Sequence, residues 1–348
     1  MNVKILNGIT PGQLFSVTIR NVTVGGSIDL SLLIKESNDY GNSWVNRHQS
    51  NIIGVAEVGN LLDFCVDAGI FQFVDLSGDE ILDDTTTSIH ILVSIKSDST
   101  EDSIYYFNYN ITSPEYSTDK NPIIWQYIED GNNVSLAIDN INKQIVYVYE
   151  KQISGTSRIY KNTIALPTGL ISPWEPIPYT PVLIESVINT WLLSSPKIAI
   201  SSTGVLAVTY YKHVAFETSA SISYPMFSKS TNGTIWSSPI ILYTQNIKNN
   251  NINYQSEYDV FTKFTPAIHF DQNDWLHIAY SYIILDNNNL IDNVIFPYRK
   301  CISRYSVSYD NGSTFLNEQL YSLDEPNIYI SYDIQHNSKG EIIISSSV

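Results

Sequence analysis

One eight-residue turn occurs twice in the sequence, as SNDYGNSW at residues 37–44 and as SYDNGSTF at residues 308–315. Both copies fit the template Ser, any residue, Asp, any residue, Gly, any residue, Ser or Thr, and an aromatic residue. The Asp carboxylate can accept hydrogen bonds from backbone N–H groups that follow it, and the Gly supplies the positive φ that a tight hairpin needs. Each stretch therefore predicts a hairpin turn that is capped by its own side chains.

The aromatic residue that ends each turn, Trp44 or Phe315, is large and apolar and can fold back over the hairpin. We expect each ring to cap its hairpin, and we expect Trp44, like Trp236 farther along the chain, to belong to the core. In this interpretation the Asp, the Gly and the aromatic residue all have a structural task, and none of them is left for catalysis.

The composition favours an all-β protein. The chain has 348 residues, of which 12% are aromatic, and its 24 Tyr are accompanied by abundant Ile, Val, Thr and Ser, which favours strands. The longest apolar runs, PIILY (239–243) and EIIISSSV (341–348), are far shorter than a membrane span. We expect no signal peptide and no transmembrane segment, which leaves a virion or particle surface and the cytoplasm both open.

The net charge of −16 comes from 19 basic and 35 acidic residues. It argues against nucleic acid and anionic membranes as partners, because both require a basic surface. It also disfavours acidic sugars unless arginines cluster locally. The two cysteines, Cys65 and Cys301, lie far apart without a CxxC spacing, so we expect free, buried thiols rather than a disulfide.

A longer pattern also repeats: an apolar strand, a polar turn, and a second apolar strand that usually ends in Tyr. It occurs at 134–150, 196–211, 266–282 and 327–348, and in a looser form at 88–109. Successive copies begin about 60 to 70 residues apart, enough for one four-stranded sheet each. Such a sheet cannot bury both of its faces alone, but it can when several sheets are stacked in a ring. We predict a single all-β domain over residues 1–348, a β-propeller of four-stranded antiparallel blades, five of them or alternatively six. The last copy stops after two strands, so we expect about residues 1–50 and 327–348 to share one blade and close the ring.

A third turn, STNGTIW at 230–236, follows the template but is one residue short. The three turns resemble Asp-box repeats of bacterial neuraminidases, and the alternation around them resembles the sialidase-like β-propeller superfamily. In that family such turns lie on outer hairpins, away from the face that binds ligands. The resemblance therefore implies a structural role for the matching positions, which are Ser37, Asp39, Gly41, Trp44, Asn232, Gly233, Trp236, Ser308, Asp310, Gly312 and Phe315.

The resemblance does not extend to the catalytic motifs. A sialidase-like enzyme needs three arginines that bind a carboxylate, the first usually in an Arg-Ile-Pro motif, together with a Tyr nucleophile, its Glu partner and an Asp acid/base. None of the five arginines here is followed by Ile-Pro; they are Arg20, Arg47, Arg158, Arg299 and Arg304. The sequence predicts no working arginine triad.

Other propeller glycosidases need two or three carboxylates at the axial mouth of the ring. Asp63 and Asp67 in LLDFCVDAG have apolar neighbours that could raise a carboxyl pKa, and Glu185 lies in VLIESVINTW. No local motif joins any two of them. We interpret all three as turn and edge residues, and we predict no catalytic residue.

A metal or cofactor is not expected. The string HFDQNDWLH (269–277) contains two His and two Asp, but Asp and Asn are ordinary turn residues, and each His can pack on a blade. The acidic loops 75–84 and 285–293 could hold Ca²⁺ through oxygen ligands, although neither has the spacing of a known calcium loop.

The remaining candidates are aromatic. Rings outside the turns could stack on sugars, and those least tied to the fold are Trp191, Tyr179, Tyr224, Tyr254 and Tyr258. The leading hypothesis is a non-catalytic binding or structural propeller that recognises a glycan or a protein. The alternative is a glycoside hydrolase whose carboxylates the sequence does not place.

Overall fold

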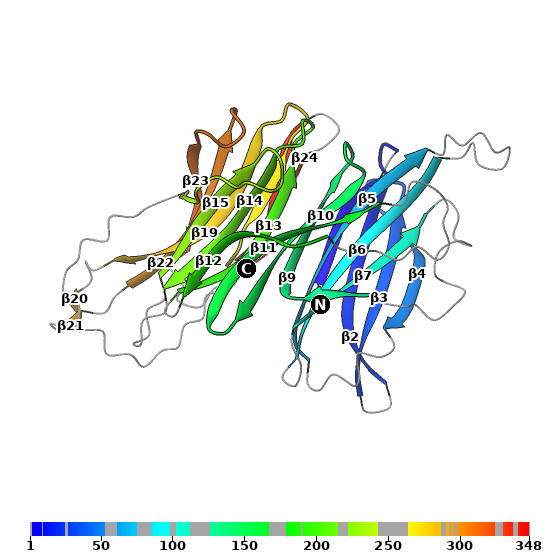
Figure 1. The fold of residues 1–348 in the computed structure, drawn as a ribbon, viewed down its shortest axis with the longest axis horizontal. Helices are drawn as coiled ribbons and strands as arrows, with labels where there is room; N and C mark the ends of the chain where they lie inside the picture. Colours follow the sequence, from blue (N-terminus) through cyan, green and yellow to red (C-terminus); the bar gives the residue numbers. More distant parts are fainter. Residues whose placement is uncertain are drawn as a thin grey trace. The chain divides into compact units, whose positions relative to one another are not determined.

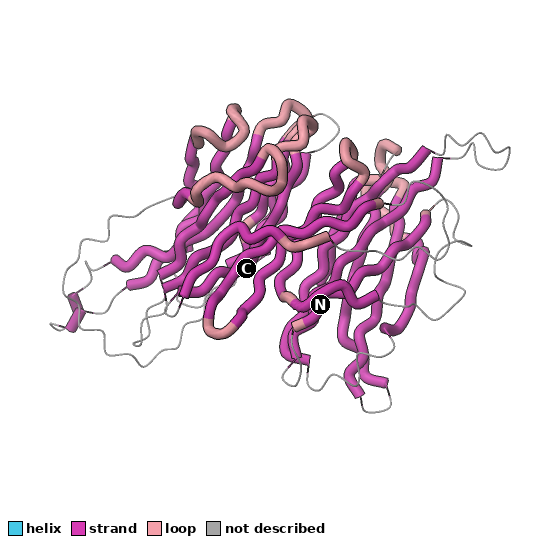
Figure 2. The backbone as a smooth tube through the Cα atoms, viewed as in Figure 1, coloured by secondary structure: helices cyan, strands magenta, loops and turns pink. Residues whose placement is uncertain are grey.

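The computed structural model describes residues 2–8, 10–24, 27–52, 61–74, 85–97, 102–111, 126–166, 179–188, 191–214, 222–242, 264–286, 290–291, 294–295, 298–323, 330–336 and 340–347. In these residues every regular element is a β-strand (Figure 1), and all strand pairs but one are antiparallel. Figure 2 accordingly shows magenta strands joined by pink loops. The predicted all-β propeller is confirmed. In the same residues, no helix has the length and hydropathy that crossing a membrane requires.

Five sheets contain four strands each. The first has β1 (Asn2–Asn7), β2 (Leu14–Val24), β3 (Ser27–Ser37) and β4 (Val45–Ile52), and the second has β5 (Leu61–Val74), β6 (Thr85–Ser97), β7 (Ser103–Asn110) and β8 (Gln126–Asp130). The third has β9 (Asn132–Asp139), β10 (Gln144–Ile153), β11 (Thr156–Ala165) and β12 (Val182–Ile188). The fourth has β13 (Trp191–Ile200), β14 (Leu206–Val214), β15 (Ile222–Ser230) and β16 (Ile240–Ile241). The fifth has β18 (Ala267–Phe270), β19 (Leu276–Asp286), β22 (Tyr298–Ser308) and β23 (Leu316–Leu323).

A sixth sheet has three strands, β17 (Phe264–Thr265), β24 (Ile330–His336) and β25 (Ile342–Ser347), and β20 (Leu290–Ile291) pairs separately with β21 (Val294–Ile295). Six blades is the second of the two numbers that the sequence allowed. The preferred number of five was too low because the segment from Asn2 to Ile52, which lacks the Tyr-ending pattern, nevertheless forms a four-stranded sheet.

The two ends of the chain lie in different sheets, which differs from the expected shared blade. In the described residues β1 to β4 already fill a four-stranded sheet, whereas β24 pairs with β25 and, in parallel, with β17. The strand β17 was not foreseen because it has only two residues. It supplies the pairing that the sequence analysis had assigned to the N-terminal strands.

The chain divides into two compact units, which we describe separately. Unit 1 contains Met1–Lys151 and Lys161–Pro181, and unit 2 contains Gln152–Tyr160 and Val182–Val348. A single domain over the whole chain therefore stays a prediction.

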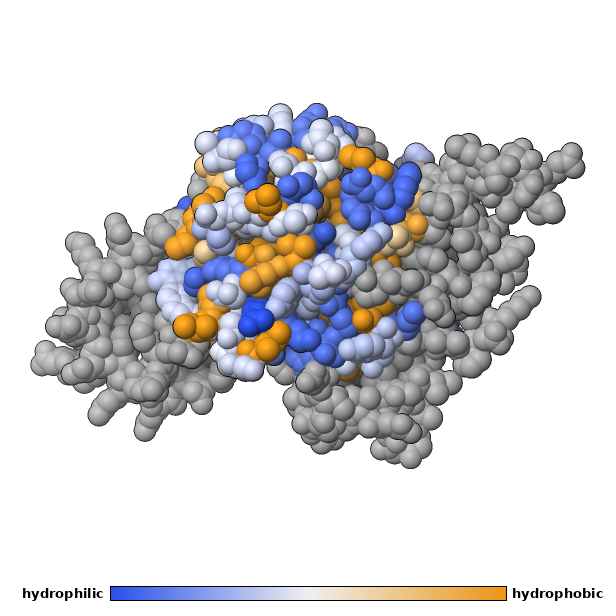
Figure 3. All heavy atoms as spheres, in the orientation of Figure 1, coloured by the Kyte–Doolittle hydropathy of each residue, from blue (hydrophilic) through white to orange (hydrophobic). Residues whose placement is uncertain are grey.

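On the face viewed in Figure 3, apolar residues are interspersed among hydrophilic ones.

Middle strands are buried on both faces. On β6, Ile89, Ile91 and Val93 are fully buried on one face, and Leu92 and Ser94 are fully buried on the other. A sheet with one solvated face would alternate buried and exposed residues along this strand. Burial on both faces is the result of stacking sheet on sheet, which is the physical reason for expecting a propeller from repeated strand pairs.

A carboxylate on the outer strand of one sheet accepts hydrogen bonds from tyrosines on the second strand of the next sheet. In unit 1, Glu129 on β8 accepts the hydroxyls of Tyr147 and Tyr149 on β10. In unit 2, Glu185 on β12 accepts the hydroxyl of Tyr210 on β14. Both glutamates follow an Ile in the sequence. The same bond thus joins consecutive sheets at equivalent positions.

Candidate functional site

The first Asp turn is closed by its own side chains. Asp39 Oδ1 accepts the backbone N–H of Ser43 at 2.8 Å and the hydroxyl of Ser37 at 2.7 Å. The Ser37 hydroxyl oxygen in turn accepts the N–H of Gly41 at 2.8 Å. Hydrogen bonds from the Ser43 side chain and backbone, together with that from Ser37, lower the pKa of Asp39 to about 2.

The second Asp turn repeats this geometry. Asp310 Oδ1 accepts the N–H groups of Ser313 at 2.9 Å and of Thr314 at 2.8 Å, and Ser308 Oγ accepts the N–H of Gly312 at 2.7 Å. The N–H of Thr314, and then the hydroxyls of Ser308 and Thr314, hold the pKa of Asp310 far below its usual range. The carboxylate is ionised and its lone pairs are occupied by the turn, as the sequence predicted.

The shorter third turn uses an amide oxygen in place of the carboxylate. Asn232 Oδ1 accepts the N–H groups of Thr234 at 2.9 Å and of Ile235 at 2.8 Å, and Ser230 Oγ accepts the N–H of Gly233 at 2.9 Å. This turn is one residue shorter than the other two, yet both hydrogen bonds to the Asn232 oxygen are formed. That the three turns are Asp-box repeats stays a prediction.

The rings that end these turns are less buried than expected. Trp44, Trp236 and Phe315 are all half-buried. The Trp44 indole N–H donates to the carbonyl of Gly41 at 3.1 Å, and Phe315 packs edge-on against Phe227, with ring centroids 5.1 Å apart. The expectation that Trp44 and Trp236 belong to the core is corrected in this respect, because both rings remain partly open to water.

The described arginines do not form a triad within either unit. In unit 1, Arg20 is exposed and Arg47 pairs with Glu36. In unit 2, Arg158 donates to Tyr160 at 3.0 Å and Arg304 donates to Tyr282 at 2.9 Å. The side chain of the fifth, Arg299, lies outside the described residues.

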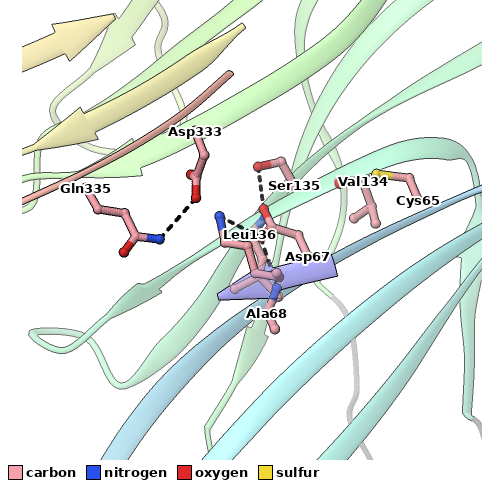
Figure 4. Close-up of polar contacts among 9 residues, drawn as sticks. Cys65, Asp67, Ala68, Val134, Ser135, Leu136, Asp333 and Gln335 are labelled. Carbon is pink, nitrogen blue, oxygen red and sulfur yellow. Dashed lines mark hydrogen bonds and ion pairs between the residues drawn. The ribbon is translucent and has the colours of Figure 1, made fainter. Parts of the chain in front are cut away.

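Asp67 is a buried carboxylate on β5, the first strand of its sheet (Figure 4). Its Oδ2 accepts the hydroxyl of Ser135 at 2.8 Å and the N–H of Leu136 at 3.0 Å, both on β9, and its Oδ1 accepts the N–H of Ala68 at 2.9 Å. Lys4 Nζ on β1 lies 3.4 Å from Oδ1. Asp67 therefore ties the first strands of three consecutive sheets together.

Asp67 lies on an edge strand of its sheet, as interpreted from the sequence, but it is buried there rather than open to water. Both carboxylate oxygens are engaged by hydrogen-bond donors, which suits a structural role. The side chain of Asp63 lies outside the described residues. Cys65 is in no disulfide within the described residues and is half-buried rather than buried, and its Sγ lies 3.6 Å from the carbonyl oxygen of Val134 (Figure 4). The side chain of Cys301 is not described either.

The His-rich string forms a turn and a histidine contact. His269 pairs directly with His277 across β18 and β19, and His269 Nε2 lies 2.6 Å from Nδ1 of His336. Asp271 Oδ1 accepts the N–H groups of Asn273 and Trp275, which closes the turn. Within the described residues no group of three His, Cys, Asp or Glu side chains is arranged to hold a metal ion. The proposed calcium loop 75–84 lies outside the described residues, and so do the side chains of 285–293.

Three separately proposed residues come together in unit 2. Glu185 on β12, Trp191 at the start of β13 and Tyr224 on β15 surround Lys212 on β14. Lys212 Nζ lies 2.9 Å from Glu185 Oε1 and 5.0 Å from the centre of the Trp191 ring, and the Tyr224 ring centroid lies 6.3 Å from that of Trp191. We call these four residues and Tyr210 the Trp191 cluster.

Strand register places these side chains on one face. Lys212 lies directly opposite both Leu193 on β13 and Tyr224 on β15. Trp191 precedes Leu193 by two residues and is therefore its neighbour on the same face, diagonal to Lys212. Tyr210 precedes Lys212 by two residues, so its hydroxyl points the same way, toward Glu185.

The cluster is half-open to solvent. Trp191 and Tyr224 are half-buried, and the Lys212 and Glu185 side chains are 25% and 12% exposed. Burial, and then the Glu185 charge, raise the pKa of the Tyr210 hydroxyl far above its usual range, so it remains a hydrogen-bond donor. An indole ring beside an acceptor and a fixed ammonium provides both a stacking surface and polar contacts for a hydroxylated ligand.

The sequence named three of these residues but not Lys212. A lysine in the run VTYYKHV gives no chemical signal by itself, and only the register with Tyr224 reveals its position. The other proposed aromatic residues do not join the cluster: Tyr179 is exposed in unit 1, and Tyr254 and Tyr258 lie outside the described residues.

No protein-family profile matches the sequence, and no curated protein matches it. Solved structures do match. A Penicillium chrysogenum alpha-L-arabinanase complexed with arabinobiose aligns with 99% of this chain and 87% of its own, with 11% identity and a TM-score of 0.55. An alpha-L-arabinofuranosidase from Fusarium graminearum in complex with an iminosugar inhibitor aligns with 99% of this chain and 91% of its own, with 8% identity and a TM-score of 0.53.

The chain shares the β-propeller fold of glycoside hydrolases. At these identities the similarity shows the fold and not the activity. A Trypanosoma rangeli sialidase aligns with 98% of this chain and 52% of its own, with 11% identity and a TM-score of 0.40, a likeness too weak to support an argument.

Proposed function

We propose that the protein is a carbohydrate-binding propeller that recognises a neutral glycan through the Trp191 cluster without hydrolysing it. The observation that carries the proposal is the position of the half-open Trp191 ring beside Lys212 and Glu185. Carbohydrate sites typically combine an aromatic ring, which contacts the C–H face of a sugar, with a few polar groups that bind its hydroxyls.

The state of Glu185 favours binding over catalysis. Tyr210 donates to its Oε2 and Lys212 to its Oε1. Both oxygens of this carboxylate are therefore already engaged by side chains of the cluster. Hydrolysis also requires a second carboxyl group about 5–9.5 Å away, and the described contacts of the cluster supply only Glu185.

The three Asp turns have a structural role in this proposal. Their carboxylate or amide oxygens are already occupied by backbone N–H groups of the same turn. They are therefore poor ligands for a sugar, and they support a scaffold on which other residues act.

A glycan array tests the proposal, run with the full chain and with Trp191→Ala. We expect the unmodified protein to retain neutral oligosaccharides and Trp191→Ala to lose the most strongly retained of them, while Tyr179→Ala, which removes an exposed aromatic ring of unit 1, should bind normally. Retention of no glycan by the unmodified protein, or equal retention by Trp191→Ala, would contradict the proposal.

A glycoside hydrolase is the second candidate, and the fold shared with an arabinanase and an arabinofuranosidase favours it. Incubation with fluorogenic arabinofuranoside, galactoside, glucoside and sialoside substrates separates the two candidates. We expect no turnover. Turnover that disappears in Glu185→Gln or Asp67→Asn would establish the enzyme and overturn the non-catalytic proposal.

A further inference from the structure

Two exposed aromatic rings meet on the turns of unit 2. Trp275 ends the turn between β18 and β19, and Tyr309 lies in the Asp turn between β22 and β23. Their ring centroids lie 4.6 Å apart at an interplanar angle of 82°, yet Trp275 is 41% exposed and Tyr309 is 55% exposed. Single exposed rings are common, whereas contiguous exposed apolar surface rimmed by polar residues is a feature of binding sites.

This ring pair is remote from the Trp191 cluster. Trp191 is the first residue of β13, and Ser202 lies just beyond the last residue of the same strand. The backbone N–H of Ser202 donates to Asp274, the residue before Trp275. A ten-residue strand spans roughly 30 Å. Figure 2 shows pink turns gathered at one end of the strands of unit 2. The ring pair and the Trp191 cluster therefore lie at opposite ends of unit 2.

Both rings stand on turns with fixed geometry. On the Trp275 side, Asp271 Oδ1 accepts the N–H of Trp275 at 2.9 Å, and Asp274 accepts the N–H of Ser202 at 2.7 Å and its hydroxyl at 2.5 Å. Asp274, with φ +59°, holds the left-handed conformation that turns the chain into Trp275.

On the Tyr309 side, the capping bonds of Asp310 fix the turn from within. Lys229 Nζ, from the neighbouring sheet, also donates to the carbonyl of Asn311 at 2.9 Å and to the hydroxyl of Ser313 at 2.7 Å. Because neither turn has to be ordered on binding, a ligand that stacks on these rings loses little conformational entropy.

The charges around the rings select the ligand. Burial opposes ionisation of Asp271, but the N–H groups of Trp275 and Asn273 and the contact with His277 outweigh it, so its pKa lies below the ordinary value. The hydrogen bond from Thr314 lowers the pKa of Asp310 more strongly. The nearby ammonium of Lys229 is held by the turn. Fixed negative charge repels sialic and uronic acids and leaves neutral sugars.

We propose that Trp275 and Tyr309 form a second carbohydrate-binding site, which takes a neutral sugar by stacking at the turn end of unit 2. The site is independent of the Trp191 cluster. Its occupant contacts the rings through C–H groups.

The test uses the full chain with Trp191→Ala, so that the first proposed site is removed. Saturation-transfer NMR is recorded with arabinobiose, lactose, maltose and cellobiose, and with 3′-sialyllactose as the anionic probe. We expect at least one neutral disaccharide to bind and the sialylated sugar not to bind. Adding Trp275→Ala or Tyr309→Ala should weaken binding about tenfold or more, a loss of about 1.4 kcal/mol, whereas Trp275→Phe should retain most of it.

Three results would overturn the proposal: no neutral disaccharide bound by Trp191→Ala, equal binding after Trp275→Ala and Tyr309→Ala, or binding of the sialylated sugar as strong as that of the neutral ones. Sedimentation of the same variants tests whether a second copy of the chain, rather than a sugar, occupies the two rings. Self-association that disappears in Trp275→Ala while sugar signals persist would assign the rings to a second copy of the chain and also overturn the proposal. If Trp191→Ala, as the only substitution, abolishes binding that the unmodified chain shows, the first proposed site is supported and the second is overturned.

Discussion

The ammonium of Lys212 lies 5.0 Å from the centre of the Trp191 ring, on the strand next to it in the same sheet. The same ammonium lies 2.9 Å from Glu185 Oε1. A cation over an indole face and beside a carboxylate fixes both groups, which is the kind of preorganisation that a binding site needs.

Replacing Lys212 should reveal how strongly it holds Glu185. In Lys212→Met the largely buried Glu185 carboxylate loses its cation, so we expect the free energy of unfolding to fall by about 2 kcal/mol. Urea titration followed by circular dichroism measures this change. As a control, Lys151→Met removes an ion pair with Asp130 whose side chains are 28% and 31% exposed, and it should cost about 0.5 kcal/mol. Equal losses in the two variants would contradict the assigned role of Lys212.

Glycines at the same position of the two Asp turns should respond differently to substitution. Gly41 and Gly312 have φ values of +86° and +78°, so an added Cβ is strained in both, by about 1 kcal/mol. A Cβ at Gly312 would also lie 2.4 Å from the Phe227 ring, whereas at Gly41 its nearest neighbour is 3.5 Å away. We expect Gly312→Ala to lower the free energy of unfolding by about 2–4 kcal/mol and Gly41→Ala by about 1 kcal/mol. Equal losses of unfolding free energy in the two variants, measured by urea titration, would show that the Phe227 ring moves aside and would contradict this expectation.

Stability should fall when the pH drops below neutrality. Burial lowers the pKa of His90 to about 3 and that of His213 to about 4, from 6.5. Between those values and 6.5 the unfolded chain binds more protons than the folded one, so the free energy of unfolding rises with pH through this window and levels off above about 7. Urea titrations at pH 7.5 and 4.5 measure the difference, and His213→Gln should reduce it. The same free energy of unfolding at both pH values would contradict this expectation.

The fold was largely predictable, because its signals are local and repeated. The Asp turns specify hairpins through bonds within eight residues, and the Tyr-ending strand pairs repeat at blade spacing. The count of blades and the pairing of the ends were less predictable. A two-residue strand such as β17 has no signal in sequence, and its pairing with β24 depends on residues far apart in the chain.

The candidate site was predictable only in pieces. Glu185, Trp191 and Tyr224 were each visible as unusual residues, but what joins them is the register of β13, β14 and β15, which a single sequence does not encode locally. The burial of Asp67 was not predictable for the same reason, since its partners Ser135 and Leu136 lie on another sheet. Trp275 was treated as part of an ordinary turn because nothing in the string DQNDW shows that Tyr309 meets it.

The central claim is that the Trp191 cluster binds a neutral glycan. The most direct measurement is a glycan array of neutral and sialylated oligosaccharides, probed in parallel with the unmodified chain, Trp191→Ala and Tyr179→Ala, followed by calorimetric titration of the strongest neutral ligand. We predict binding that falls about tenfold or more in Trp191→Ala, equivalent to about 1.4 kcal/mol, and that is unchanged in Tyr179→Ala. An array on which the unmodified chain binds no neutral glycan, or a Trp191→Ala protein that binds as tightly as the unmodified one, would contradict the claim.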